Sequence, residues 1–154
     1  MKIQFCIAYK NDDGGTSILI PASATFDIEK LAETNIPKME DGTARPYRIV
    51  DVNKIPKDRY FRNAWTDDFK TDTVDVDPVK AVEIQMGHIR KLRDEKLKNL
   101  DVDYMIALEA DNNTKKASIK KDKQHLRDLP ATVDLFRHGN DLEALKADFG
   151  GLDN

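Results

Sequence analysis

A chain of 154 residues is long enough for one ordinary domain, or for a small domain with a long helical extension, and too short for two large domains. Hydrophobic residues make up 40% and charged residues 34% of the chain, and no apolar run approaches the ~20 residues of a membrane helix, so a membrane protein is not expected. The net charge of −3 gives no overall attraction to nucleic acid, although residues 78–128 are basic between two acidic ends.

The N-terminal residues predict synthesis in the cytoplasm. They lack the long apolar stretch and the small-residue cleavage site of a signal peptide. Cys6 is the only cysteine, which leaves no intrachain disulfide and no cysteine-based metal cluster. A buried position in a strand is the expected place for its side chain.

The chain is predicted to begin with an antiparallel β-hairpin. Residues 2–9 alternate strictly and predict a half-buried strand, with one face formed by Ile3, Phe5, Ile7 and Tyr9. Residues 11–15 read Asn-Asp-Asp-Gly-Gly, types that tolerate the positive φ angles of a tight turn. The returning strand is expected over 16–20.

A short helix and a further strand are expected to complete a small α+β domain over residues 1–77. Asp27 can cap a helix over 28–34, because its carboxylate accepts the free N–H groups of a first turn. A strand is expected over 47–52. The stretch around Val74 and Val76 forms either one more short strand or an extended linker.

Residues 53–65 bring together aromatic and cationic side chains. Tyr60, Phe61 and Trp65 lie close in sequence, with Arg59 and Arg62 between them. Aromatic rings and arginines are enriched at interfaces, because rings bury a large area and guanidinium groups stack on them. The alternative is that Phe61 and Trp65, at spacing i and i+4, dock one helical turn onto the sheet. Both interpretations stay open.

A helical hairpin is predicted over residues 78–130. Asp77 followed by Pro78 is a strong helix start, because proline has no N–H to leave unsatisfied there. An amphipathic first helix is indicated by the apolar stripe Val79, Val82, Met86, Ile89, Leu97 and Leu100. Arg93 interrupts that stripe and is expected to pair with Asp122 or Asp128, or alternatively to meet a partner.

The first helix is expected to break near Asp101 or Asp103. A separate short helix over 104–110 is then predicted, with three side chains facing inward: Val102, Met105 and Ile106. The returning helix is expected over 114–128, ending before Pro130, with the thin apolar stripe Ile119, Leu126 and Leu129. So thin a stripe needs the first helix or another subunit to hold it.

A basic stripe runs along the predicted returning helix. Its four members lie at i, i+4, i+7 and i+11 and therefore align on one face: Lys116, Lys120, Lys123 and Arg127. Such a stripe can follow phosphates or hold an acidic protein surface. The alternative is an ordinary solvated lysine face.

The last segment, 131–154, is expected to contain an irregular apolar stretch and one short helix. Asn140 is the expected cap of that helix, with Glu143 completing a capping box. An acidic tail follows. The overall prediction is an α+β fold: a small antiparallel sheet with one short helix, followed by a helical hairpin and a short C-terminal helix.

No catalytic, cofactor-binding or metal-binding pattern is found in the sequence. The serines are not part of Gly-x-Ser-x-Gly, and the three histidines are too far apart to place two ligands on one helical face. The glycines do not form a phosphate-binding loop, and the acidic residues 67–77 lack the glycine and glutamate of an EF-hand. We therefore expect neither an enzyme nor a bound cofactor.

Several segments resemble a family of small uncharacterised proteins encoded in tailed phages and prophages. They are YRIVD at 47–51, IPKDRYFRNAW at 55–65, IRKLRDEKLKNLDVDYMIALEAD at 89–111 and KQHLRDLPA at 123–131. The helical part also looks like the C-terminal helical segment of phage tail or tail-fibre assembly chaperones. The resemblance implies a phage origin, with no catalytic residue to carry over.

These observations lead to one main hypothesis and two alternatives. The main hypothesis is a non-enzymatic phage structural or assembly protein, either a virion-associated tail or fibre adaptor or a tail-assembly chaperone. Its partners would be other phage structural proteins or further copies of itself, met in the host cytoplasm or in the virion. The alternatives are a small inhibitor of a host or defence enzyme and a nucleic-acid binder. Candidate partner-binding residues are Arg59, Tyr60, Arg62, Trp65, Arg93, Lys116, Lys120, Lys123 and Arg127.

Overall fold

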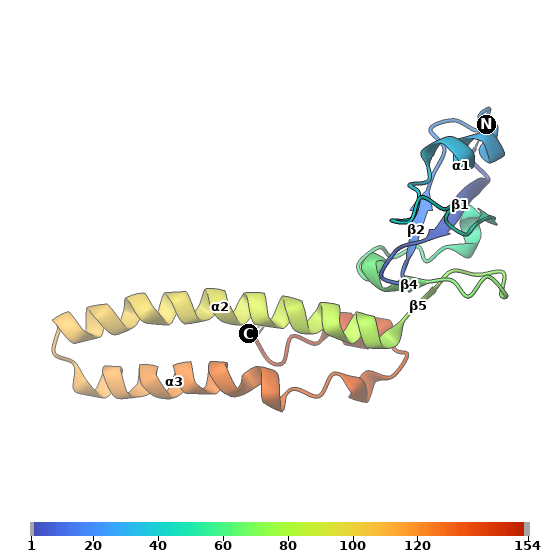
Figure 1. The fold of residues 1–154 in the computed structure, drawn as a ribbon. Helices are drawn as coiled ribbons and strands as arrows, with labels where there is room; N and C mark the ends of the chain where they lie inside the picture. Colours follow the sequence, from blue (N-terminus) through green and yellow to red (C-terminus); the bar gives the residue numbers. More distant parts are fainter. Residues whose placement is uncertain (1, 153–154) are drawn as a thin grey trace. The chain divides into compact units, whose positions relative to one another are not determined.

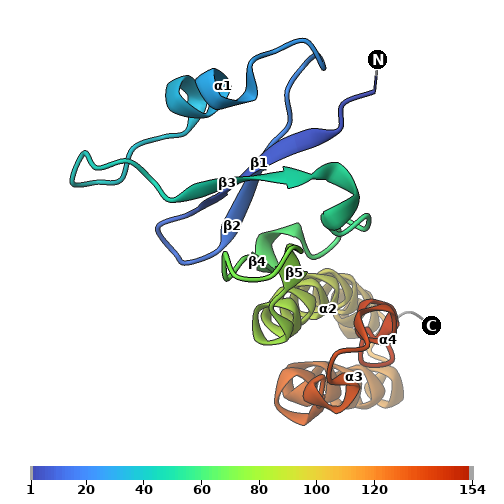
Figure 2. The ribbon, with the colours of Figure 1, turned by 90° about the vertical axis from the view of Figure 1, so that its right-hand side faces the viewer.

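The computed structural model of the protein describes residues 2–152 and has the predicted α+β fold (Figures 1 and 2). The chain forms two compact units, Met1–Ala81 and Val82–Asn154, called unit 1 and unit 2 below. Unit 1 holds the small sheet, and unit 2 holds most of the helical hairpin and the short C-terminal helix. The end of the acidic tail expected at the C-terminus lies outside the described residues.

A three-stranded antiparallel sheet forms the centre of unit 1. Its strands have the spatial order β2-β1-β3, with β1 Phe5–Lys10, β2 Thr16–Leu19 and β3 Tyr47–Asp51. The predicted hairpin is confirmed: the Asn11 N–H donates to the Gly15 carbonyl at 2.8 Å, and Gly14 has φ +76°. Two further short strands, β4 Trp65–Thr66 and β5 Asp75–Val76, form a separate antiparallel pair.

The central strand β1 is buried on both faces, so the prediction of a half-buried strand was wrong. Cys6, Ile7 and Ala8 are fully buried, whereas Phe5 is 45% exposed. One face packs into a cluster of Cys6, Ala8, Val50, Trp65 and Val74. Helix α1, Ile28–Asn35, lies against β1 and buries Ala32. The predicted cap of α1 is confirmed, since Asp27 Oδ1 accepts the N–H groups of Glu29 and Lys30.

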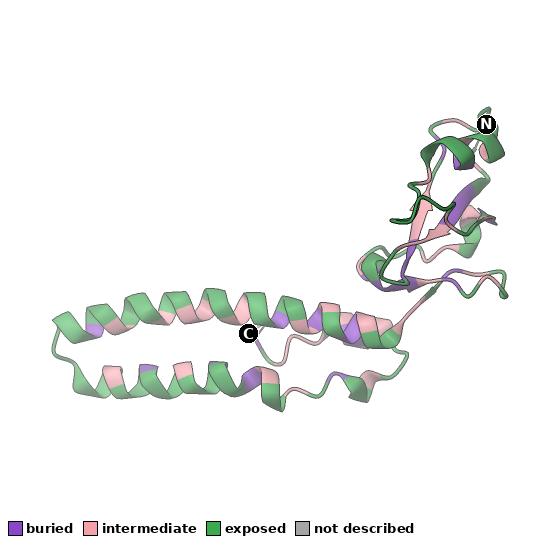
Figure 3. Cartoon of the chain, in the orientation of Figure 1, coloured by how far each residue is buried: buried purple, intermediate pink, exposed green. Residues whose placement is uncertain are grey.

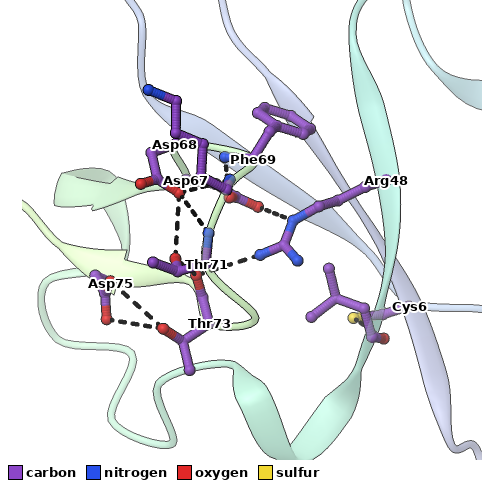
Figure 4. A network of polar contacts seen from close by, with 10 residues as sticks. Cys6, Arg48, Asp67, Asp68, Phe69, Thr71, Thr73 and Asp75 are labelled. Carbon is purple, nitrogen blue, oxygen red and sulfur yellow. Dashed lines mark hydrogen bonds and ion pairs between the residues drawn. The ribbon is translucent and has the colours of Figure 1, made fainter.

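A polar network fastens the loop between β4 and β5 to the sheet (Figure 4). Arg48 on β3 donates from Nε to Asp67 Oδ2 at 2.6 Å and from Nη2 to the Thr73 carbonyl at 3.2 Å. The other carboxylate oxygen of Asp67 accepts the N–H of Phe69, which lies in the left-handed region at φ +59°. The Asp67 side chain is fully buried, so both of its oxygens depend on these partners.

Helix α2 runs without interruption over Pro78–Glu109, beginning in unit 1 and continuing through unit 2. Its predicted start is confirmed, because Asp77 Oδ1 accepts the N–H groups of Val79 and Lys80. The predicted break near Asp101 or Asp103 and the separate helix over 104–110 were wrong. Asp101 instead forms an ion pair with Lys123 of the returning helix, and helix propensity is too weak a preference to end a helix by itself.

Helix α3, Asn113–Thr132, returns beside α2 (Figures 1 and 2). The predicted apolar stripe is confirmed: Ile119, Leu126 and Leu129 are buried. The predicted end before Pro130 was wrong, because Pro130 lies in the last helical turn. There the missing N–H of the proline removes one helical hydrogen bond, the one to the Leu126 carbonyl, and the Val133 N–H closes the helix on the Leu129 carbonyl at 3.0 Å.

The C-terminal segment of unit 2 is held by buried polar contacts. Helix α4 covers Leu142–Ala147 and is capped by Asp141, which accepts the Ala144 N–H, so the predicted Asn140 cap and its capping box with Glu143 were wrong. The buried side-chain amide of Gln85 on α2 donates to the carbonyls of Asp148 at 2.7 Å and Lys146 at 3.4 Å. Leu135 and Leu145 are almost completely buried in the same unit.

Candidate functional site

A pocket of about 380 Å³ lies in unit 1 between the β1–β2 hairpin and the segment 59–65. Its walls include Thr16, Ser17, Arg59, Arg62, Asn63 and Trp65. Three of the candidate residues, Arg59, Arg62 and Trp65, thus meet at one site, because the turn that ends in β4 returns to the strand β2. The fourth candidate of this segment, Tyr60, is not part of the wall and packs edge-to-face on Phe61 at 4.8 Å.

Two residues that line this pocket each have a buried polar atom without a hydrogen-bond partner among residues 2–152: Trp65 Nε1 and Thr16 Oγ1. Both residues are only 5% exposed. A buried donor or acceptor left unsatisfied costs about 1–3 kcal/mol, so native proteins contain few of them. The sequence could not predict these two unpartnered atoms. Strand alternation predicts the side of the sheet on which Thr16 lies, but not which groups surround its hydroxyl.

The pocket carries positive charge at its rim. The exposed Arg59 and Arg62 both line it, and neither forms an ion pair with a carboxylate of residues 2–152. Asp13 also lines the pocket, and one of its oxygens accepts the Gly15 N–H at 2.9 Å. Phe61 and Trp65 are buried in unit 1, as the docking interpretation predicts. Contact of the two exposed arginines with a partner stays a prediction.

Arg93 lies elsewhere, in unit 2, and does not pair with Asp122 or Asp128 as predicted. Its guanidinium instead donates to Asp94, the next residue, from Nε at 3.0 Å and from Nη2 at 2.7 Å. The carboxylate that pairs with Arg93 therefore comes from the same helix, and this ion pair does not join α2 to α3. The side chain is 21% exposed, which fits a long stem lying along the apolar stripe.

The basic stripe of α3 faces a ring of α2. The ammonium groups of Lys120 and Lys123 lie 5.8 and 5.5 Å from the centre of the Tyr104 ring, and these residues form an open depression with Gln124 and Arg127. Two members of the stripe also have carboxylate partners: Lys116 pairs with Asp111 at 3.4 Å, and Lys123 pairs with Asp101. Half of the charge of the stripe is thus compensated within the hairpin.

An apolar surface on α2 was missed because its residues were expected to face inward. Val102, Met105 and Ile106 are 60, 54 and 54% exposed, and we call them the outer apolar stripe. The break expected near Asp103 would have reset the helical register. Without that break, the period of α2 turns Ala107 and Tyr104 toward α3 and leaves Val102, Met105 and Ile106 on the opposite side. Figure 3 shows that most of the far part of the hairpin is exposed.

Cys6 and Asp148 have shifted pKa values that follow from burial and from hydrogen bonds within the fold. Burial, helped by the charge of Asp51 and opposed by Arg48, raises the pKa of the Cys6 thiol to about 11, so it stays protonated at neutral pH. In unit 2, burial raises the pKa of Asp148, but hydrogen bonds from His138, the Gly150 N–H and Arg137 outweigh it and lower the pKa below 3.8. Within residues 2–152, no three His, Cys, Asp or Glu side chains gather where they could hold a metal ion.

None of the helices formed by residues 2–152 combines the length and the apolar character that crossing a bilayer requires. Comparisons of the chain with protein-family models, with curated proteins and with solved structures found no match.

Proposed function

We propose that the protein is a non-enzymatic assembly protein of a tailed phage. It acts through protein–protein contacts, as a tail or fibre adaptor in the virion or as a tail-assembly chaperone. The observation that carries this proposal is the outer apolar stripe on α2, which is made of large side chains that the rest of unit 2 leaves in water.

The stripe has the shape of a helical docking face. Val102, Met105 and Ile106 follow the i, i+3, i+4 spacing by which an amphipathic helix presents anchors to a groove. Each side chain has roughly half of its surface exposed, so covering it would contribute about 1 kcal/mol, and the three together about 3 kcal/mol before the cost of association. A partner with a complementary apolar face is the occupant that this chemistry fits.

The phage context is supported by the resemblance of segments 47–65 and 89–131 to proteins of tailed phages. The helical segment that looks like tail-assembly chaperones is the one that carries the outer apolar stripe. Proteins that hold assembly intermediates need an apolar face that a later subunit covers or replaces, so the exposed stripe and the resemblance point to the same role.

The direct test is quantitative mass spectrometry of the phage that encodes the chain. Purified particles and purified tail-assembly intermediates are compared, with the copy number of the protein measured in each. An adaptor is expected in both, and a chaperone in the intermediates alone. Absence from both refutes the proposal, and recovery of the chain bound to a host enzyme would favour the inhibitor.

A matched pair of variants tests the surface itself. Met105→Gln with Ile106→Gln should leave the helix content unchanged, since both side chains are already half in water, and should lower incorporation of the protein about tenfold or more. Val79→Gln removes an apolar side chain of similar exposure, 52%, from the start of the same helix and serves as the control. If the two variants are recovered in particles and assembly intermediates in equal amounts, the outer apolar stripe is not the surface that binds the partner.

A second candidate function, nucleic-acid binding, is favoured by Tyr104 lying beside Lys120 and Lys123. An aromatic ring among cations can stack a base while the cations follow the phosphates. The test is binding to single-stranded DNA over a range of salt concentrations, with Lys120→Gln and Arg127→Gln. Affinity that is insensitive to salt and to both substitutions would exclude this function.

A further inference from the structure

Trp65 and Thr16 line the same pocket, and each has a buried polar atom without a hydrogen-bond partner among residues 2–152. Trp65 Nε1 is a donor only, so a molecule that satisfies it must present an acceptor. Thr16 Oγ1 can accept or donate, and the exposed guanidinium groups of Arg59 and Arg62 are donors with a positive charge. These groups together describe a receptor for an anionic oxygen.

The kind of anion follows from the remaining charge in the wall. Asp13 places a carboxylate in the same pocket, which opposes a doubly charged phosphate more strongly than a singly charged carboxylate. The planar forks of the two arginines match a carboxylate and a phosphate alike, so the charge of Asp13 decides between them. A carboxylate is therefore the group that the pocket fits.

A second, apolar pocket adjoins the first. It has a volume of about 170 Å³, shares Ile18, Arg59 and Trp65 with the first pocket, and adds Ile20, Val52 and Ile55 to its wall. The two together form one groove in unit 1 with a cationic half and an apolar half. A ligand that fills it must carry an acidic group and an apolar group next to each other.

The wall of the groove includes residues of the outer strand of the sheet. Thr16 and Ile18 belong to β2, which is the outer strand in the order β2-β1-β3. An extended peptide can lie along such an edge with alternate side chains entering pockets, the mode known as β-strand addition. We propose that this groove binds an extended peptide segment of a partner, with an acidic side chain in the arginine half and a neighbouring apolar side chain in the other half.

The inference concerns unit 1 and does not depend on the role proposed for the outer apolar stripe. The experiment uses the full chain and a library of capped pentapeptides in which acidic and apolar residues are varied at neighbouring positions, with glutamine in place of glutamate as the neutral counterpart. Trp65 is the only tryptophan, so its indole N–H gives a single resonance that reports directly on Nε1.

Acidic–apolar peptides are expected to shift the indole resonance, and their glutamine counterparts are not. Arg59→Gln with Arg62→Gln should weaken binding about tenfold or more, since each removes charge-assisted hydrogen bonds. Arg90→Gln, which removes an exposed arginine of unit 2, is the matched control and should bind normally.

Thr16→Val separates binding from folding. The hydroxyl has no hydrogen-bond partner among residues 2–152, so its loss should leave the urea midpoint unchanged or higher while it weakens peptide binding. The inference is overturned if no peptide pool moves the indole resonance, if the arginine and control variants bind alike, or if inorganic phosphate or a phosphopeptide binds more tightly than the acidic peptides. Absence of the chain from both the particles and the assembly intermediates, together with a groove that binds peptides, would reject the proposed function alone.

Discussion

Replacing Asp67 by asparagine is expected to destabilise unit 1 strongly. The carboxylate is fully buried and accepts Arg48 Nε on one oxygen and the Phe69 N–H on the other. An amide offers one acceptor where the carboxylate offers two, so one of these donors loses its partner, and the Arg48 guanidinium, whose side chain is 20% exposed, loses its counter-charge. Breaking a buried pair costs about 3–5 kcal/mol. The partial exposure of Arg48 reduces this to about 2–4 kcal/mol.

The same loop supplies the control. Asp72 pairs with Lys54 at 3.1 Å, but their side chains are 78 and 45% exposed, so Asp72→Asn should cost less than about 1 kcal/mol. Urea unfolding followed by the fluorescence of Trp65 reports on unit 1, because that ring packs with Cys6 and Val50. At about 1–1.5 kcal/mol per M, Asp67→Asn should lower the midpoint by about 2 M. Equal midpoints for the two variants would refute the reasoning.

Three further outcomes follow from the structure. Cys6 should resist iodoacetamide at pH 8 in the folded protein and react once urea is added, because its thiol is buried and its pKa is raised to about 11; equal reactivity in both states contradicts this. Ile89→Ala, at a fully buried position of α2, should lower the stability of unit 2 by about 2–5 kcal/mol, measured by helical circular dichroism during urea unfolding, whereas a loss below about 1 kcal/mol would contradict its place in the core. Asp148 has a lowered pKa in the folded state, so the stability it contributes is present above pH 3.8 and is lost as the pH falls through the lower folded value. Asp148→Asn should therefore make the stability fall less steeply at acidic pH. An unchanged acid limb of the stability–pH curve would show that other groups produce it.

Most local signals with a short-range mechanism were confirmed, but the Asn140 cap and the helix end before Pro130, which are also local, were wrong. The Asp27 and Asp77 caps and the glycine turn at Gly14 each depend on contacts within a few residues, and each is present. Signals that depend on a distant contact failed. Asp101 has low helix propensity, but its partner Lys123 comes from the other helix, and no local pattern shows such a pair. The strand β1 looked half-buried for the same reason, because the covering of its second face by Trp65 and Val74 is a tertiary event.

The candidate site could be predicted only in part. The spacing of Arg59, Arg62 and Trp65 marked the segment, yet the pocket exists because Thr16 and Ser17 of a strand far away in sequence complete its wall. Arg93 pairs with its neighbour Asp94 and not with a carboxylate on α3, and a helical wheel does not show which carboxylate an arginine will choose. Whether Val102 and Ile106 face α3 or the solvent depends on whether α2 continues past Asp101. Because α2 is continuous, both side chains are exposed.

The uneven burial of α2 has a consequence for motion. Between Ile89 and Ala107 no side chain of α2 is buried, so the far part of the hairpin is held by few apolar contacts and by ion pairs near its surface. Segments of this kind open locally at a low free energy and exchange their amide hydrogens early. A partner that covers the outer apolar stripe would therefore order the helix as it binds, and part of the binding energy would be used for that ordering. Substitutions that only raise helix propensity, such as Asn99→Ala at an exposed site, would then strengthen binding without touching the partner.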